Sequence, residues 1–336
     1  MPLASSWEGR GMFISVLICS RNRADSLCQT LESLFCTSNL ELPDWEVLVV
    51  ESSTDHTGEV CLEFQRRFPR HFRFLTENRL GKSNALNTAI AAAQGDILAF
   101  TDDDVLCAPD YIQGVRTVFN SYSVDAAQGR VLLDFEGGWP EWLDRNFLAL
   151  MADLRDYGDE ALALDATLCG GTLCGTNMIV RAEVFQKTGG FAPELGPAGV
   201  GMWEDTEISL RMRQAGCRMI YAPQVLVRHQ WPLGRLSKSF IRTRFFQQGR
   251  AEAYYAPLPV SLFRFGLYVI KRTIFQEAAA IWHRFAGRPA LALRCQCEAR
   301  THAGFLRQHW LFRRGLPRRL SGDLPSTRKV ELQSWK

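Results

Sequence analysis

Short apolar runs alternate with helix-like segments through the first hundred residues of the chain. The apolar runs lie at residues 13–19, 46–50, 72–75 and 97–100. Runs of this length are typical of strands that are buried on both faces of a sheet. The segments between them, at 24–36, up to 68 and at 83–94, carry apolar residues at helical spacing. The pattern predicts an α/β fold with a doubly wound, mostly parallel sheet flanked by helices.

Polar residues follow the predicted strands. Ser20-Arg21-Asn22-Arg23 comes after the first strand, and the fourth strand ends in three consecutive acids, Asp102, Asp103 and Asp104, here called the acid triplet. The carboxyl ends of parallel strands meet at one edge of a sheet, and ligands of such folds bind there. Clustered carboxylates suit a hard divalent cation beside a phosphate group. We therefore expect the site to centre on the acid triplet.

The next hundred residues are less regular. A helix is expected at 111–121, a strand at 125–133 and an irregular insertion at 139–157. A glycine-rich segment at 170–177, which permits close approach of a ligand to the backbone, leads into a strand at 178–180. The loop at 189–201 is long and rich in glycine and proline, as lids often are. These signals predict one ligand-binding unit over residues 1–230 and an extension over 231–336.

Charge also separates the extension from the body. The formal net charge is +3, but the chain up to Val227 has 18 basic and 31 acidic residues, whereas Arg228 to Leu320 has 18 basic and 3 acidic residues. Helical patterns at 236–253 and 257–286 combine this basic character with aromatic side chains. Such helices are typical of an anionic membrane surface, while no aromatic-basic motif indicates nucleic acid. The alternative is a packed helix with a solvated basic face.

Cysteine usage and hydropathy indicate the cellular compartment in which the protein works. The ten cysteines show no repeated framework and no zinc-finger spacing, which favours a reducing compartment. The N-terminus has no signal-peptide pattern, and no apolar run reaches membrane-spanning length without a charge. We therefore expect a cytoplasmic protein that is peripheral at the cytoplasmic face of a membrane.

Taken in order, these motifs resemble the inverting family 2 glycosyltransferases, which have a GT-A-type nucleotide-sugar-binding fold. The resemblance covers roughly residues 12–230 and rests on CSRNR at 19–23, VVESSTD at 49–55, NRLGKSNALN at 78–87, FTDDD at 100–104, the glycine-rich segment before Asn177, and Glu204-Asp205. It implies transfer of a single sugar from a nucleoside-diphosphate sugar to a hydroxyl of a glycan or lipid-linked acceptor. The lack of spanning helices argues against a processive synthase.

The resemblance implies a metal site of the DxD type. Asp104 is expected to ligate Mn²⁺ or Mg²⁺ directly, with Asp102 nearer the nucleotide ribose. A cation held by carboxylates neutralises the departing diphosphate as a Lewis acid. His229 stands where a histidine completes the metal shell in some relatives, although a histidine after a strand is also common as a structural residue. A solvated turn is the alternative for the triplet.

An inverting reaction also needs a base that takes the proton from the acceptor hydroxyl. The resemblance assigns this role to Asp205, with Glu204 positioning the acceptor or the base. The alternative is that Asp205 only favours the start of its helix, where a carboxylate is stabilising.

The remaining assignments concern the nucleotide donor. The residues expected around it are Ser20, Arg21, Arg23, Glu51, Lys82 and Asp103. Glu51 stands where the family usually has an aspartate that bonds the base, and Lys82 is placed to reach a phosphate. Asp103 has no more specific role, and ordinary surface charge is the alternative for the basic residues.

Two other functions remain open at this point. A nucleotidyltransferase that makes a nucleotide sugar shares a similar sheet and acid pair, but it normally has a glycine- and arginine-rich loop after the first strand, and the segment 20–23 has no glycine. A non-catalytic binding scaffold would not need all of Asp102, Asp104, Glu204 and Asp205.

Overall fold

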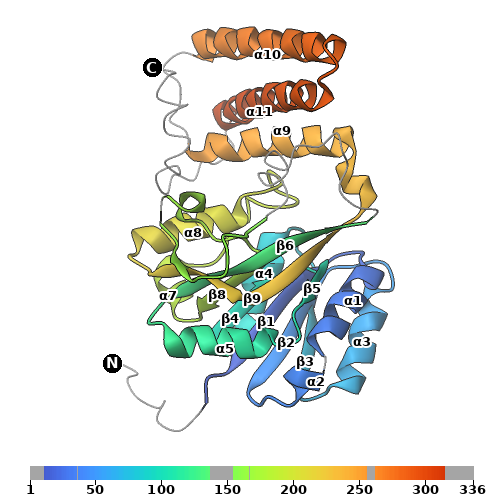
Figure 1. Cartoon of the computed structure of the whole chain (residues 1–336), viewed down its shortest axis with the longest axis vertical. Coiled ribbons are helices and arrows are strands. Elements are labelled where there is room, and N and C mark those ends of the chain that lie inside the picture. Colours follow the sequence, from blue (N-terminus) through green and yellow to red (C-terminus); the bar gives the residue numbers. More distant parts are fainter. Residues whose placement is uncertain (1–10, 36, 137–153, 166, 256–261, 315–336) are drawn as a thin grey trace.

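The computed structural model describes residues 11–35, 37–136, 154–165, 167–255 and 262–314. Figure 1 shows a sheet with helices on both faces, and three helices stacked beyond it. The insertion expected at 139–157 lies largely outside the described residues.

The first half of the chain forms the strands and helices expected from its apolar pattern. In chain order these are β1 (Ile14–Ser20), α1 (Ala24–Leu34), α2 (Thr37–Leu40), β2 (Trp45–Glu51), α3 (Thr57–Arg67), β3 (Phe72–Thr76), α4 (Lys82–Ala92) and β4 (Ile97–Thr101). The four strands are parallel, in the spatial order β3-β2-β1-β4. Their carboxyl ends therefore meet at one edge of the sheet, as predicted.

The second half extends the sheet with mixed strand directions. Its elements are β5 (Val105–Cys107), α5 (Tyr111–Ser121), β6 (Ala126–Phe135), β7 (Leu162–Ala163), η1 (Cys169–Gly171), β8 (Asn177–Arg181), α7 (Val184–Thr188), α8 (Glu204–Gln214), β9 (Met219–Trp231) and η2 (Leu233–Leu236). The sheet continues from β4 through β8, β6 and β9 to β5, with β7 beside β9. β8 is antiparallel to β4 and β6, and β5 is antiparallel to β9.

Two pairings bring distant segments to the carboxyl end of β4. Thr101 pairs with Asn177, so the glycine-rich segment before β8 lies against the start of the acid triplet. Val105 pairs with His229, which places this histidine beside the other end of the triplet. The register of β8 and β9 thus fixes what surrounds the three acids.

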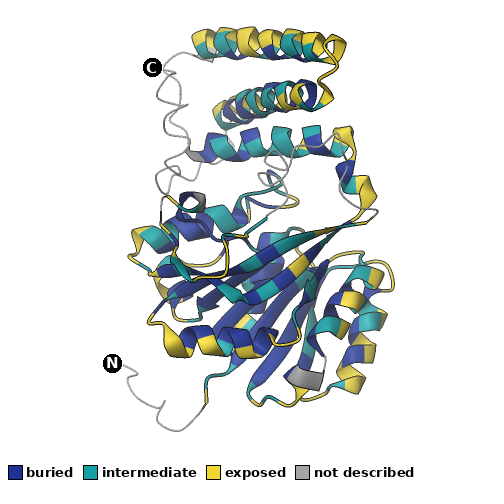
Figure 2. Cartoon of the chain, viewed as in Figure 1, coloured by how far each residue is buried: buried dark blue, intermediate teal, exposed yellow. Residues whose placement is uncertain are grey.

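The sheet is buried on both faces, which explains the continuous apolar runs. Along β1, Val16 and Ile18 pack into one core and Leu17 into the other, because successive side chains point to opposite faces. Helices α1, α3 and α5 cover the first face, and α4, α7 and α8 cover the second. Figure 2 shows the central strands β1, β2 and β4 mostly in the colour of buried residues, whereas β6 and β9 are partly intermediate.

Three helices form the extension. They are α9 (Lys238–Tyr255), α10 (Leu262–Phe285) and α11 (Pro289–Arg313). The patterns at 236–253 and 257–286 correspond to α9 and α10, whereas α11 was not expected. α11 lies between the other two, so the order outward from the sheet is α9, α11, α10 (Figure 1). No helix within the described ranges has both the length and the apolar character needed to cross a membrane.

Candidate active site

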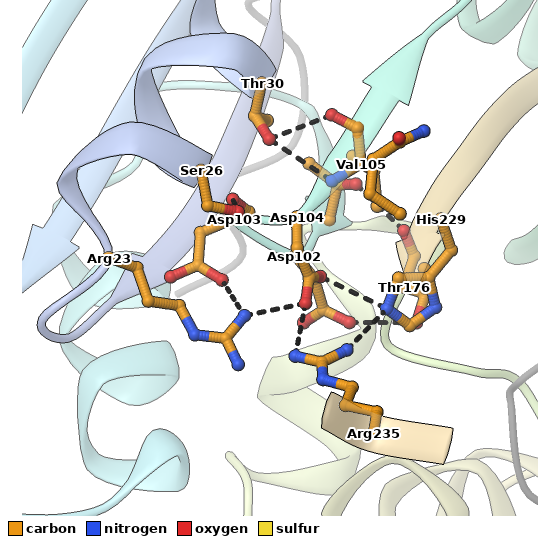
Figure 3. A network of polar contacts seen from close by, with 12 residues as sticks. Arg23, Ser26, Thr30, Asp102, Asp103, Asp104, Val105, Thr176, His229 and Arg235 are labelled. Carbon is orange, nitrogen blue, oxygen red and sulfur yellow. Dashed lines mark hydrogen bonds and ion pairs between the residues drawn. The ribbon is translucent and has the colours of Figure 1, made fainter. Parts of the chain in front are cut away.

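The acid triplet occupies a tightly held turn between β4 and β5. Ser26 donates a hydrogen bond to the carbonyl oxygen of Asp103 (2.7 Å), and Thr30 bonds both the amide and the carbonyl of Val105. On the other side, Thr176 donates to Asp102 Oδ2 (2.9 Å). Helix α1 and the segment before β8 therefore clamp the turn from both sides (Figure 3). This arrangement is not the solvated turn that was the alternative.

Two arginines from distant parts of the chain contact the triplet. Arg23 lies 3.0 Å from Asp103 Oδ1 and 2.6 Å from Asp104 Oδ2. Arg235, in η2, reaches the same Oδ2 at 2.5 Å. Figure 3 shows both guanidinium groups converging on Asp104. Their positive charge offsets the repulsion among three adjacent carboxylates, of which Asp103 and Asp104 are buried.

The three carboxyl groups differ in pKa. Burial raises the pKa of Asp103 to about 6, and Arg23 opposes this only in part. Burial acts the same way on Asp104, but the contacts with His229, Arg235 and Arg23 outweigh it and hold its pKa well below the usual range. For Asp102, Lys82 similarly overcomes burial and lowers the pKa. Asp102 and Asp104 are thus the acids held ionised.

Asp102, Asp104 and His229 have the composition and spacing of a metal site. Each offers one ligand atom, and these atoms lie within 4.8 Å of one another. His229 Nε2 is 3.2 Å from Asp104 Oδ1, while its Nδ1 is buried and has no hydrogen-bond partner among the described residues. Two carboxylates and an imidazole suit a divalent cation, so the residues present fit the metal that the resemblance implies.

Glu204 and Asp205 form the first turn of α8 and face the same cleft. Asp205 Oδ2 accepts a hydrogen bond from the amide of Gly175 (3.0 Å), and Oδ1 accepts from the amide of Thr206 (2.7 Å). The residue before the helix, Trp203, makes no side-chain cap. Asp205 therefore does more than begin its helix: it ties α8 to the glycine-rich segment that also borders the acid triplet.

Lys82 connects the acid triplet to the acid pair. Its Nζ lies 2.5 Å from Asp102 Oδ1 and 3.8 Å from Glu204 Oε1. Although burial lowers it, the pKa of Lys82 is raised well above its ordinary value by these two acids. Burial raises the pKa of Glu204 to about 7, which Lys82 opposes. The two groups of acids, a hundred residues apart in sequence, are therefore one electrostatic unit.

The structure brings most of the expected nucleotide residues to this cleft. Ser20, Arg21, Arg23 and Lys82 line it, and Ser20 donates a hydrogen bond to Asp103 Oδ2 (2.7 Å). Glu51 is placed differently. Its buried carboxylate accepts hydrogen bonds from the Ser53 amide (2.7 Å) and the Thr76 hydroxyl (2.8 Å), and the neighbouring Ser52 lines the cleft instead.

The cleft has a volume of about 690 Å³ and includes residues that sequence reasoning missed, namely Arg155, Trp231, Arg235 and Phe240. It is also lined by Arg244, Gln247 and Gln248, which belong to the basic helix expected at 236–253. The basic segment at 244–250 was a candidate to close over the diphosphate, and its place at the cleft agrees with that interpretation. The loop at 189–201 contributes Pro197, Ala198, Gly199 and Gly201, so it borders the cleft as a lid would.

Comparison with known proteins agrees with this geometry. The chain is 28% identical over 247 residues to a glucosyl-dolichyl phosphate glucuronosyltransferase of Haloferax volcanii, covering 71% of this chain and 75% of the relative. It is 26% identical over 193 residues to a beta-monoglucosyldiacylglycerol synthase of Nostoc sp., covering 56% of this chain and only 39% of that longer protein. A mannosyltransferase of Pyrobaculum calidifontis, solved with GDP-Man and Mn²⁺, superposes with a TM-score of 0.54 at 18% identity, covering 97% of this chain and 81% of that chain.

The family assignment rests on a family model that matches more than half of the chain. Residues 11–248 match the family model described as Glycosyltransferase like family 2, a range that includes the acid triplet, the acid pair, His229 and Arg235. Together with the sheet topology and the solved relative, this match confirms the predicted fold class. The chain belongs to glycosyltransferase family 2 and has a GT-A fold.

Proposed function

We propose that the protein is an inverting, metal-assisted glycosyltransferase that moves one sugar from a nucleoside-diphosphate sugar to a hydroxyl of a glycan or lipid-linked acceptor. The observation that carries the proposal is the pairing of two acid groups in one cleft. Asp102 and Asp104, with His229, lie on one side, the Glu204-Asp205 pair lies on the other, and Lys82 bridges them. Two separate acid groups suit this reaction, because the leaving diphosphate needs its negative charge neutralised whereas the attacking hydroxyl needs a base that takes its proton.

The donor side is assigned to the acid triplet and its neighbours. Asp102, Asp104 and His229 would hold a divalent cation, with Mn²⁺ favoured over Mg²⁺ because an imidazole is among the ligands. When bound, the cation would supply Lewis-acid neutralisation of the diphosphate charge. Ser20, Arg21 and Arg23 line the adjacent part of the cleft and are assigned to the nucleotide.

The acceptor side is assigned to Asp205 and Glu204. The Asp205 carboxylate is held in a fixed orientation by the amides of Gly175 and Thr206. It takes the proton from the acceptor hydroxyl as that oxygen bonds to the sugar carbon and the bond from this carbon to the diphosphate breaks. Glu204, whose pKa burial raises, lies next to Asp205 and is assigned to position the acceptor or the base.

The proposal also places the reaction at an anionic membrane, on its cytoplasmic side. The extension is strongly basic, with 18 basic and 3 acidic residues from Arg228 to Leu320. Two relatives carry names that refer to dolichyl phosphate and to diacylglycerol. Eight of the ten cysteines are described as free thiols, which agrees with a reducing compartment.

A thermal-shift screen tests the donor half of this proposal. Nucleoside diphosphates and nucleotide sugars, GDP-mannose among them, are added with Mn²⁺ or Mg²⁺, and the unfolding temperature is measured. A ligand that binds only the folded protein adds about 2.7 kcal/mol at a hundred times its Kd. We expect at least one nucleotide to raise the unfolding temperature, and to do so more strongly when Mn²⁺ is present.

The donor found in this way then allows the stereochemical half to be tested. NMR of the product should show the anomeric configuration opposite to that of the donor. No stabilisation by any nucleotide, or a product of retained configuration, would rule the proposal out.

A further inference from the structure

The outermost helix carries an unusual amount of exposed apolar surface. Of the fifteen large apolar side chains that are exposed in the described part of the chain, eight lie on α10. They are Phe263 (76% exposed), Leu267 (45%), Ile270 (51%), Ile274 (64%), Phe275 (63%), Ile281 (57%), Trp282 (60%) and Phe285 (90%). A concentration of this kind on one element marks an interaction surface.

Six of these side chains form one stripe along α10. Phe263, Leu267, Ile270, Ile274, Ile281 and Phe285 are separated by three, four or seven positions, the spacing that keeps residues on one face of a helix. The buried residues of α10, namely Val269, Gln276 and Ala280, lie on the side that packs on α11. At about 100° per residue they lie roughly opposite the stripe. The stripe therefore points away from the molecule, and Figure 2 shows this helix mostly in the colours of exposed and intermediate residues.

The charge on α10 selects the kind of partner. The helix has four basic residues, Arg264, Lys271, Arg272 and Arg284, against one acid, Glu277. All four basic residues are exposed. Arg264 and Lys271 flank one side of the apolar stripe, and Arg284 flanks the other side, where it shares the border with Glu277. An apolar stripe with basic borders matches a bilayer whose headgroups are negative, because the apolar side chains enter the acyl boundary while the cations remain among the phosphates. A second copy of this chain would instead bring two basic borders together.

We infer that the outer face of α10, centred on Ile274, is a docking surface for an anionic phospholipid bilayer. The inference deepens the proposed function by assigning its membrane partner to one helix face, and it rests on that proposal only for why a bilayer would be needed. α11 and α9 lie between this face and the cleft (Figure 1), so docking uses none of the catalytic residues.

Vesicle binding by the full chain tests this inference without measuring turnover. Sedimentation compares phosphatidylcholine vesicles with vesicles that also contain phosphatidylglycerol. Ile274→Glu is the test variant, and Leu62→Glu, at an exposed leucine (49%) on α3 of the catalytic body, is the matched control. Both positions are exposed, so neither change disturbs the core, and unfolding temperatures verify this.

We expect the unaltered protein to bind the anionic vesicles and to be released by salt, which screens the attraction. Ile274→Glu should lower the partition coefficient at least about tenfold, because it removes an apolar anchor and adds a repelled charge, whereas Leu62→Glu should change it less than about twofold. The double variant Arg264→Gln/Lys271→Gln should weaken binding to anionic vesicles specifically.

Three results would overturn the inference: no binding of the unaltered protein to anionic vesicles, equal binding by Ile274→Glu, or loss of a dimer in Ile274→Glu with vesicle binding intact. The last would identify a surface between copies of the chain. The nucleotide-dependent thermal shift is measured on the same samples. If it persists while vesicle binding fails, the docking surface and the membrane location are wrong, and the proposed sugar transfer from a nucleotide donor stands.

Discussion

Asp104 is the most heavily contacted member of the acid triplet. It meets Arg23, Arg235 and His229, whereas Asp103 faces Ser20 and Arg23 on the other side of the turn. Of these two adjacent acids, only Asp104 contacts His229, so we propose different tasks for them. Asp104 would ligate the cation, and Asp103 would shape the nucleotide pocket.

Asp104→Asn should therefore lower Mn²⁺ affinity at least about 100-fold. Loss of a residue that only bonds to a metal ligand costs up to about 100-fold, and loss of a direct ligand should cost at least as much. The measurement is Mn²⁺ binding followed by electron paramagnetic resonance, which needs no substrate. Asp103→Asn is the matched control and should keep Mn²⁺ affinity within about tenfold. Equal losses in both variants would contradict the division of tasks.

Sequence reasoning found the acids but not all of the cations around them. The acids of the triplet stand directly after a predicted strand, so their position in the sequence already places them at the edge of the sheet where ligands bind. Arg235 comes 131 positions after Asp104 and reaches it only because β9 returns beside β5 and η2 turns back toward the cleft. Nothing in the local pattern around Arg235 carries that information, and the same holds for Arg155.

At the scale of elements, the loop between β3 and α4 holds Lys82 in place. Glu77 begins this loop and accepts hydrogen bonds from Arg79 and from Thr88 on α4. The Arg79 side chain is the main reason that the pKa of Glu77 is lowered from 4.5 to about 2. Ionised Glu77 thus fastens the loop to the helix that presents Lys82.

Glu77→Gln should destabilise the protein by about 2 kcal/mol at pH 7, the usual scale for hydrogen bonds to a charged group. Because the folded-state pKa is lowered, this contribution is present above about pH 4.5 and is lost as the pH falls toward 2. Urea unfolding at pH 7 and pH 3 measures the difference, which should shrink at the lower pH. Glu59→Gln, at an exposed position, should have little effect at either pH. A pH-independent loss for Glu77→Gln would refute the assignment.

Glycines set the distance between α9 and α11. A Cβ at Gly304 would lie 2.0 Å from the carbonyl oxygen of Phe246, and one at Gly249 would lie 1.9 Å from that of Thr301. Both obstacles are backbone atoms, which cannot rotate away. The helices therefore cross in a contact that admits no side chain at these positions.

Gly304→Ala should destabilise the protein by about 1–3 kcal/mol through overpacking, measured from the midpoint of urea unfolding. Gly266→Ala on α10 is the matched control, since a Cβ there meets nothing within 4 Å. That change should stabilise the protein by about 0.5–1 kcal/mol, because alanine favours helix over glycine. Similar effects at both positions would show that the crossing is not close.

The apolar pattern predicted elements better than it predicted their directions. Three of the first four strands, β1, β2 and β4, were recognisable because they are buried on both faces. Periodicity does not encode direction, so it could not show that β8 enters antiparallel beside β4. Helix α11 escaped prediction because buried Gly304, Gln308 and His309 interrupt its apolar face.

At the scale of the whole molecule, the division of charge along the sequence is also a division in space. The acidic part forms the body with the sheet, and the basic part forms the stacked helices beyond it (Figure 1). The boundary expected at residue 230 nevertheless crosses the cleft, because Arg235, Arg244 and Gln247 line it together with residues of the body. Composition predicted the two parts, whereas only the fold shows that they share a site.

The central claim is that one cleft separates leaving-group stabilisation by Asp102 and Asp104 from acceptor activation by Asp205. Single-turnover transfer by Asp205→Asn, saturated with donor and Mn²⁺, tests it most directly. We expect Asp205→Asn to bind donor within about twofold of the unaltered protein and to transfer the sugar about 10²–10⁴ times more slowly, the usual contribution of a general base. Transfer at an undiminished rate would contradict it and would reduce Asp205 to a residue that only ties α8 to Gly175.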